Sequence, residues 1–361
     1  MKTRFLGAAA LLAVFILVAA PLQAQFGDMS AEESAAADAD YQKYCALCHG
    51  TEREGYVNDQ APSLRSESLM KSGYPTELLY TIGYGRRGTP MGAFSEEMGG
   101  PLKREEIRRL TRWLKEQVGV EPADLSYEPV TGDVGLGEKT FADHCVKCHG
   151  TQGEGEIGPA IGNPAMLSLT SDAFIKYAIE NGRDGTEMRP FREQLSVDEI
   201  NGVTAFLRTR ASGWKMEMPV LEAPPAPEDW ILNPASPAPE FVLKDDTYVS
   251  ANDLLRAVQE KRRMVLLDTR VTSTWQMAHI EGSVPMPYYD DFDTVTANLP
   301  TDGTWIVSYC ECPRAAAESV NSELVKQGFQ NTAVLWEGIQ GWVALGYPVS
   351  VGQSTVMETT P

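Results

Sequence analysis

Two short cysteine motifs hold the residues best suited to chemistry in this sequence of 361 residues. A C-x-x-C-H pattern begins at Cys45 and recurs 100 residues later, at Cys145. In such a motif, two thiols bond the vinyl groups of one haem while the adjacent histidine binds its iron, so spacing and chemistry are coupled. The residues concerned are Cys45, Cys48, His49, Cys145, Cys148 and His149.

Cysteines spaced C-x-x-C have two other common uses, as a redox disulfide and as half of a zinc site. Neither use explains the histidine that directly follows the second cysteine, and this histidine is present in both copies. We therefore predict that the chain carries two covalently attached haem c groups.

The second axial ligand of each iron must come from elsewhere in the repeat. The chain has only four histidines, so two bis-histidine sites would have few candidates. Met91 and Met188 lie in matching glycine-containing loops downstream of the two motifs. Core packing is the usual role of a methionine, but the repeated position favours ligation. The predicted iron ligands are His49 and Met91 in the first repeat, and His149 and Met188 in the second.

Helical patterns surround both motifs. Candidate helices lead into them at 40–44 and 136–144, and each repeat ends in an amphipathic segment, at 103–114 and 196–207. With the motifs and the methionine loops, this organisation resembles class I cytochrome c over about residues 38–212. The resemblance implies all-α domains, single-electron transfer through a His/Met-ligated iron, and a proline carbonyl that orients each histidine. The matching prolines are Pro62 and Pro159.

The pattern changes after a proline-rich segment at 216–240. Apolar runs at 264–268 and 304–309 predict buried strands, and segments 251–260 and 315–327 predict helices. Strands that alternate with helices favour an α/β domain with a parallel sheet.

Residues 241–350 resemble a rhodanese domain, a sulfurtransferase fold. The resemblance rests on Leu267–Arg270, on His279–Pro285 and on the closing segment 335–348. It implies that Cys310, between a strand and a helix, is a nucleophile that accepts sulfane sulfur as a persulfide and passes it to a thiophilic acceptor.

The loop at Cys310 departs from the commoner pattern of that family. Backbone N–H groups at a helix N-terminus would stabilise a thiolate, but Pro313 removes one donor and Glu311 adds negative charge. Arg314 could restore positive charge, and Cys312 could resolve a persulfide by exchange. The alternatives are a silent binding domain and a loop whose two thiols are oxidised together.

The N-terminus has the three parts of a secretory signal: a basic start, an apolar run at 5–20, and a small-residue cleavage site at Ala24. The run is shorter than the roughly 20 apolar residues of a membrane span. We expect a soluble periplasmic or otherwise exported protein that is not an integral membrane protein, with an uncleaved anchor as the alternative.

The formal net charge of −19 disfavours nucleic acid and favours a redox partner protein with a basic docking surface. The chain is predicted to be multidomain. Its parts are a signal peptide (1–24), two cytochrome c domains (25–120 and 121–215), a proline-rich linker (216–240) and a rhodanese-like domain (241–352).

These features predict an exported dihaem cytochrome whose single-electron transfer is coupled to sulfur transfer, or to oxidation of a small sulfur compound, at Cys310. One alternative is a non-enzymatic electron carrier whose rhodanese-like domain docks a partner. Another is a redox or sulfide sensor.

Overall fold

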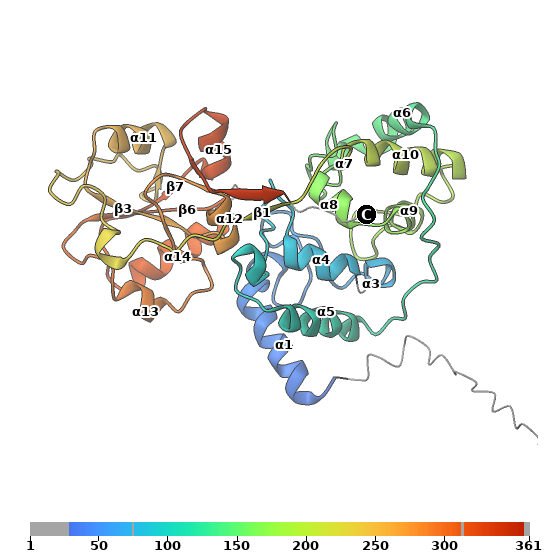
Figure 1. The fold of residues 1–361 in the computed structure, drawn as a ribbon, viewed down its shortest axis with the longest axis horizontal. Coiled ribbons are helices and arrows are strands. Elements are labelled where there is room, and N and C mark those ends of the chain that lie inside the picture. The colour runs from blue at the N-terminus through green and yellow to red at the C-terminus, as the bar shows by residue number, and fades with distance from the viewer. Residues whose placement is uncertain (1–28, 74–75, 312–313, 357–361) are drawn as a thin grey trace, which may run out of the picture.

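The computed structural model describes residues 29–356 except 74–75 and 312–313. The chain folds into two helical units and an α/β domain, which lies to one side of them (Figure 1). This confirms the predicted fold class. The predicted signal peptide, Cys312 and Pro313 fall outside the described residues. Across the described part of the chain, no helix combines the length and the apolar character needed to cross a bilayer.

The first helical unit is built on two helices that pack against each other, α1 and α5. A capping box between Ser30 and Glu33 starts α1, which is why this helix begins well before the segment predicted from the sequence. The predicted apolar face of α5 is confirmed, since Ile107, Leu110 and Trp113 are buried. The elements are α1 (Ala31–Tyr44), α2 (Ala46–His49), α3 (Glu67–Gly73), α4 (Thr76–Tyr84), η2 (Glu96–Met98) and α5 (Arg104–Val118).

The second unit repeats this plan, with α6 and α10 as its main pair. These helices cross closely enough to require glycine: a Cβ on Gly137 would lie 1.9 Å from the carbonyl oxygen of Gly202. A capping box between Ser196 and Glu199 starts α10. The elements are α6 (Val134–His144), α7 (Val146–His149), α8 (Pro164–Leu169), α9 (Asp172–Asn181) and α10 (Val197–Thr209).

The third domain contains a five-stranded parallel sheet in the order β2-β7-β6-β3-β5. All five residues of β3 are buried, as its continuous apolar run predicts for a strand covered on both faces. The strands are β2 (Tyr248–Val249), β3 (Met264–Asp268), β5 (Val284–Pro285), β6 (Trp305–Tyr309) and β7 (Thr332–Leu335), beside a small pair formed by β4 (Ala278–His279) and β8 (Ser350–Val351). The helices are α11 (Ala251–Gln259), α12 (Thr272–Met277), α13 (Phe292–Thr296), α14 (Ala315–Lys326) and α15 (Gly338–Ala344).

The proline-rich segment 216–240 is tied to the third part of the chain at its start and in its middle. Near its start, β1 (Glu217–Pro219) pairs antiparallel with β9 (Ser354–Val356). It continues through a short turn, η3 (Pro227–Asp229), to Trp230, which is buried in the core of the third domain.

Asp184, in the second helical unit, joins it to the first. Its carboxylate accepts hydrogen bonds from the backbone N–H groups of Glu67 and Ser68, both at 2.8 Å, and from the hydroxyl of Ser66 at 3.0 Å. These donors lie at the start of α3, where unpaired N–H groups favour an anion. Partial burial favours the neutral carboxyl, but the backbone hydrogen bonds from Ser68 and Glu67 outweigh it and lower the pKa of Asp184.

The third domain completes the core of the first helical unit. Val271 and Tyr289 belong to the same apolar cluster as the buried side chains of α1 and α5. Two hydrogen bonds fix this contact: the Tyr288 hydroxyl donates to the carbonyl of Tyr44 at 2.5 Å, and the Ser273 hydroxyl donates to the carbonyl of Ala93 at 2.6 Å.

Replacing Asp184 by alanine should weaken the contact between the helical units. We expect a loss of about 1 kcal/mol in the free energy of unfolding, the usual cost of removing a helix cap, measured by chemical denaturation. Because the pKa of Asp184 is lowered on folding, this contribution should be full above about pH 4 and should fall as the pH drops through the folded-state pKa. Equal stability of Asp184→Ala and wild type at pH 7 would contradict the assignment.

Candidate functional site

Each C-x-x-C-H motif forms a tight helical turn directly after a longer helix. In the first, the backbone N–H of His49 donates to the carbonyl of Cys45 at 3.0 Å, and Gly50 then turns the chain with φ of 81°. The second motif has the same turn, with His149 bonded to Cys145 at 3.0 Å. The sequence therefore places two cysteines and one histidine on a single turn in both units.

The two histidines have matching partners. The Nδ1 atom of His49 lies 2.8 Å from the carbonyl oxygen of Pro62, and that of His149 lies 3.0 Å from the carbonyl oxygen of Pro159. Since a carbonyl only accepts, each Nδ1 carries the proton and each Nε2 keeps its lone pair for a metal. Burial is the main cause that lowers the pKa of both histidines, which favours the neutral imidazole needed for ligation. These contacts are the ones that the cytochrome c resemblance implied.

The loops that carry Met91 and Met188 repeat one hydrogen-bond pattern. In the first, the N–H of Arg86 donates to the carbonyl of Met91 at 2.7 Å, and the Thr89 hydroxyl donates to the carbonyl of Arg86 at 2.7 Å and accepts from the N–H of Met91 at 3.2 Å. The second loop has the same three bonds, at 2.7, 2.7 and 3.1 Å. Both methionines are thus held in equivalent turns.

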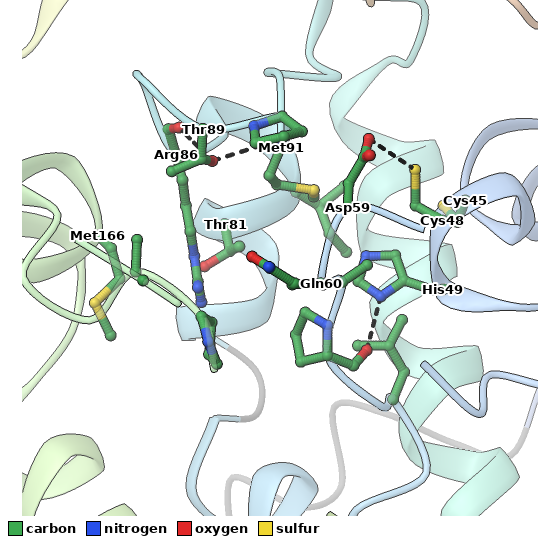
Figure 2. A pocket seen from close by; sticks show the side chains of 18 of the residues that line it. Cys45, Cys48, His49, Asp59, Gln60, Thr81, Arg86, Thr89, Met91 and Met166 are labelled. Atoms are coloured by element: carbon green, nitrogen blue, oxygen red, sulfur yellow. Dashed lines mark hydrogen bonds between the residues drawn. The ribbon is translucent and has the colours of Figure 1, made fainter. Parts of the chain in front are cut away.

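A cavity of about 470 Å³ connects these features. His49, Met91, His149 and Met188 all line it, so the two candidate haem sites open into one space. Figure 2 shows His49 and Met91 entering the cavity from separate segments, with Cys45 and Cys48 beside His49. Met166 lines the same cavity from the second unit.

The surroundings of Arg86 show whether the residues that line this cavity suit a haem. Its side chain extends into the cavity (Figure 2), its Nε has no hydrogen-bond partner, and it forms no ion pair with any described residue. Burial lowers the pKa of this guanidinium to about 10, so it remains charged at neutral pH and requires an anion. The propionate carboxylates of haem c would supply one. Arg183 occupies the equivalent position in the second unit and lines the same cavity.

Cys310 lines this cavity too, although it belongs to the third domain. It directly follows β6, only 4% of it is exposed, and the backbone N–H groups of Ala316 and Ala317, in the first turn of α14, hydrogen-bond its sulfur. Burial is the largest cause that raises the pKa of the Cys310 thiol, and the carboxylates of Asp59 and Glu311 raise it further.

The two arginines near Cys310 are already paired. Arg270 binds Asp268 at 2.6 Å and Glu311 at 3.0 Å. Arg314 binds Glu318 at 3.3 Å and lies over the ring of Trp336. The Arg314 side chain is thus held by Glu318 on α14 and by Trp336, which directly follows β7.

Three other cavity-lining residues were not predicted from the sequence: Asp59, Arg86 and Tyr288. Arg86 could have been predicted from the sequence, because a Gly-Arg pair precedes both methionines at the same spacing. Asp59 and Tyr288 are brought to the cavity by contacts between domains, for which no local pattern exists.

Comparison with known proteins identifies the parts of the chain. The family model described as cytochrome c oxidase, cbb3-type, subunit III matches residues 32–114 and 132–207, and the model of the rhodanese-like domain matches residues 250–345. The chain joins two cytochrome c segments to a rhodanese-like domain. Cytochrome c segments carry covalently attached haem c and transfer electrons.

Several relatives match the cytochrome part. The cbb3-type cytochrome c oxidase subunit FixP of a Bradyrhizobium species is 29% identical over 179 residues, which is 47% of this chain and 58% of that protein. Cytochrome c-L of Methylorubrum extorquens is 34% identical over 83 residues, 22% of this chain and 42% of that protein. The chain thus spans less than two thirds of the length of these relatives.

Solved structures match individual parts of the chain. The rhodanese-like domain of the Alr3790 protein from an Anabaena species is 25% identical, with a TM-score of 0.27, and covers 29% of this chain and 78% of that one. A chain of the Kuenenia stuttgartiensis reducing HAO-like protein complex is 19% identical, with a TM-score of 0.34, and covers 51% of this chain and 97% of that one.

We expect Arg86→Gln to lower the midpoint potential of the haem held by the first motif. Loss of a cation near the iron favours the ferric state, by about 1 kcal/mol or roughly 40 mV for one electron. A spectroelectrochemical titration measures the shift. Arg86→Lys should restore part of it, and Arg87→Gln, at an exposed neighbouring position, serves as the control. A potential unchanged in Arg86→Gln would show that this guanidinium has no haem propionate as its partner.

Proposed function

We propose that this protein is an exported dihaem c-type cytochrome that transfers single electrons and couples them to oxidation or transfer of sulfur at Cys310. The observation that carries the proposal is the shared cavity. Cys310 faces the same space as Cys48 and His49 of the first motif, although more than 250 residues separate them along the chain.

The haem sites are assigned from the repeated geometry. In each site, two cysteines of the motif attach the haem, and a histidine and a methionine bind the iron. The proposed sets are Cys45, Cys48, His49 and Met91 for the first haem, and Cys145, Cys148, His149 and Met188 for the second. Two haems of the same kind are supported by the matching histidine–proline contacts, the matching methionine loops and the cavity that both sites share.

Two one-electron carriers suit sulfur oxidation. Haem c, when bound, gains or loses one electron at its iron. Joining the Cys310 sulfur to a second sulfhydryl breaks two S–H bonds, forms one S–S bond, and releases two protons and two electrons. One molecule of this protein could therefore hold both electrons before a partner removes them.

The N–H groups of Ala316 and Ala317 support sulfur chemistry, because they stabilise a thiolate or persulfide on Cys310. In this proposal Cys310 is the catalytic residue. Arg314 is assigned a supporting role through its contact with Glu318 on α14, and Cys312 remains a candidate for resolving the persulfide.

Location and partner follow from the sequence. We infer a periplasmic or otherwise exported protein from the signal at 1–24. The proposed domains are 25–120, 121–215 and 241–352, with Trp230 of the preceding segment packed into the core of the last one. The net charge of −19 favours a redox partner with a basic docking surface.

A second function has an observation in its favour. Burial raises the pKa of the Cys310 thiol, which keeps it protonated at neutral pH and weakens it as a nucleophile. On this account the protein is a non-enzymatic electron carrier, and the rhodanese-like domain is a docking module for a partner.

The number of haems can be measured directly. We expect the Cys145→Ala/Cys148→Ala variant to retain one covalent haem where the parent holds two, because each cysteine pair forms both thioether bonds of one haem. Intact mass and haemochrome absorbance measure the ratio. The Cys310→Ser variant, as the control, should keep both haems. A double variant that still carries two covalent haems would refute the assignment.

Sulfur coupling is tested by mixing the oxidised protein anaerobically with sulfide, polysulfide or thiosulfate. We expect sulfide to reduce the haems, followed optically, and to leave a persulfide on the Cys310 peptide, followed by mass, because joining two sulfhydryls releases two electrons. Polysulfide and thiosulfate carry sulfur that is already oxidised, so its transfer alone should leave the haems oxidised. Both should be lost in Cys310→Ser and kept in Ser308→Ala, a buried change two residues earlier on β6. If no donor reduces the haems, or if Cys310→Ser is reduced as fast as wild type, the docking function is the correct one.

A further inference from the structure

The chamber around Cys310 limits what can reach its sulfur. The first helical unit covers this part of the third domain: α2, which carries the first haem motif, contacts α14, the helix that follows Cys310. The buried hydrogen bond from Ser273 to Ala93 and the bond from Tyr288 to Tyr44 hold this cover in place. Only 4% of Cys310 is exposed beneath this cover, which leaves a folded donor protein little of the residue to contact.

The charge of the chamber adds a second restriction. Asp59 comes from the first helical unit and Glu311 from the third domain. Both line the same cavity as Cys310, and their carboxylates raise the pKa of its thiol. The neighbouring cation, Arg270, is neutralised by its bonds to Asp268 and Glu311. One oxygen of Asp59, Oδ1, is buried without any hydrogen-bond partner among the described residues.

Since Arg270 also neutralises Glu311, the carboxylate left unpaired near the sulfur is that of Asp59. Burial raises the pKa of Asp59 to about 6, so this carboxylate is ionised at neutral pH. With Arg86 assigned to the haem propionates, an incoming anion would meet the charge of Asp59.

We propose that Cys310 accepts small, uncharged sulfur compounds, such as hydrogen sulfide in its neutral form or a small neutral thiol. Anionic donors such as thiosulfate, and protein-bound persulfides, are excluded. Asp59 is the residue that sets this preference, and it reaches Cys310 only because the cytochrome part covers the rhodanese-like domain. The inference rests on the proposed function, since it names the substrate class of the same cysteine.

Two alkylating reagents that differ in charge test this selectivity without using haem chemistry. Iodoacetamide is neutral and iodoacetate is an anion; with either reagent the sulfur forms an S–C bond, the C–I bond breaks and iodide leaves. The experiment uses the haem-loaded full chain with the substitution Cys312→Ser. In this variant the four motif cysteines are thioethers and Cys310 is the remaining thiol. Masses of the Cys310 peptide give both rates, and Cys310→Ser identifies the product that belongs to Cys310.

Relative to a free cysteine, iodoacetate should be disfavoured at Cys310 by about tenfold, as expected for an anion entering a cleft of like charge. Asp59→Asn, an isosteric change, should reduce this discrimination severalfold. Glu323→Gln removes a charge from α14 and should leave the discrimination unchanged. A maleimide on a long polyethylene glycol chain should leave Cys310 unmodified.

The proposal is overturned if iodoacetate reacts at Cys310 with the same rate, relative to iodoacetamide, as it does with free cysteine, or if the large maleimide labels it rapidly. Equal discrimination in Asp59→Asn and wild type would remove Asp59 from its assigned role. None of these alkylation rates depends on haem reduction. The selectivity of Cys310 is therefore measured separately from the sulfur-coupled function, and either one can fail without the other.

Discussion

The packing of the rhodanese-like domain against the first helical unit is the constraint on which the site depends. Tyr289 and Val271 complete an apolar core that otherwise belongs to the cytochrome part, and the Tyr288 hydroxyl bonds a carbonyl at the end of α1. That carbonyl belongs to Tyr44, which directly precedes the first haem cysteine. The same contact therefore positions the haem motif and encloses Cys310.

The two helical units share the same internal hydrogen-bond contacts but have different neighbours. The proline contacts of His49 and His149 and the turns at Met91 and Met188 match closely. Among the described residues, α2 of the first motif contacts α14, the helix that follows Cys310, whereas His149 of the second motif shares the cavity with Cys310. The two repeats, alike in their internal contacts, thus differ in how they meet the third domain.

Much of this arrangement could be predicted because it is local. The C-x-x-C-H turns, the strands β3 and β6 and the buried faces of α5 and α10 follow from spacing and apolar periodicity. Met91 and Met188 were found because the chain repeats itself. Asp59 and Tyr288 were missed because they reach the cavity through contacts between units, and such contacts depend on how whole surfaces fit together.

An experimental structure of the oxidised, haem-loaded protein is the most direct test of the shared cavity. We expect Cys310 to face the space beside the haem attached to Cys45 and Cys48, with the Tyr288 hydroxyl bonded to the Tyr44 carbonyl. A structure in which the rhodanese-like domain is separated from the first helical unit, or in which a wall of side chains lies between Cys310 and that haem, would contradict it.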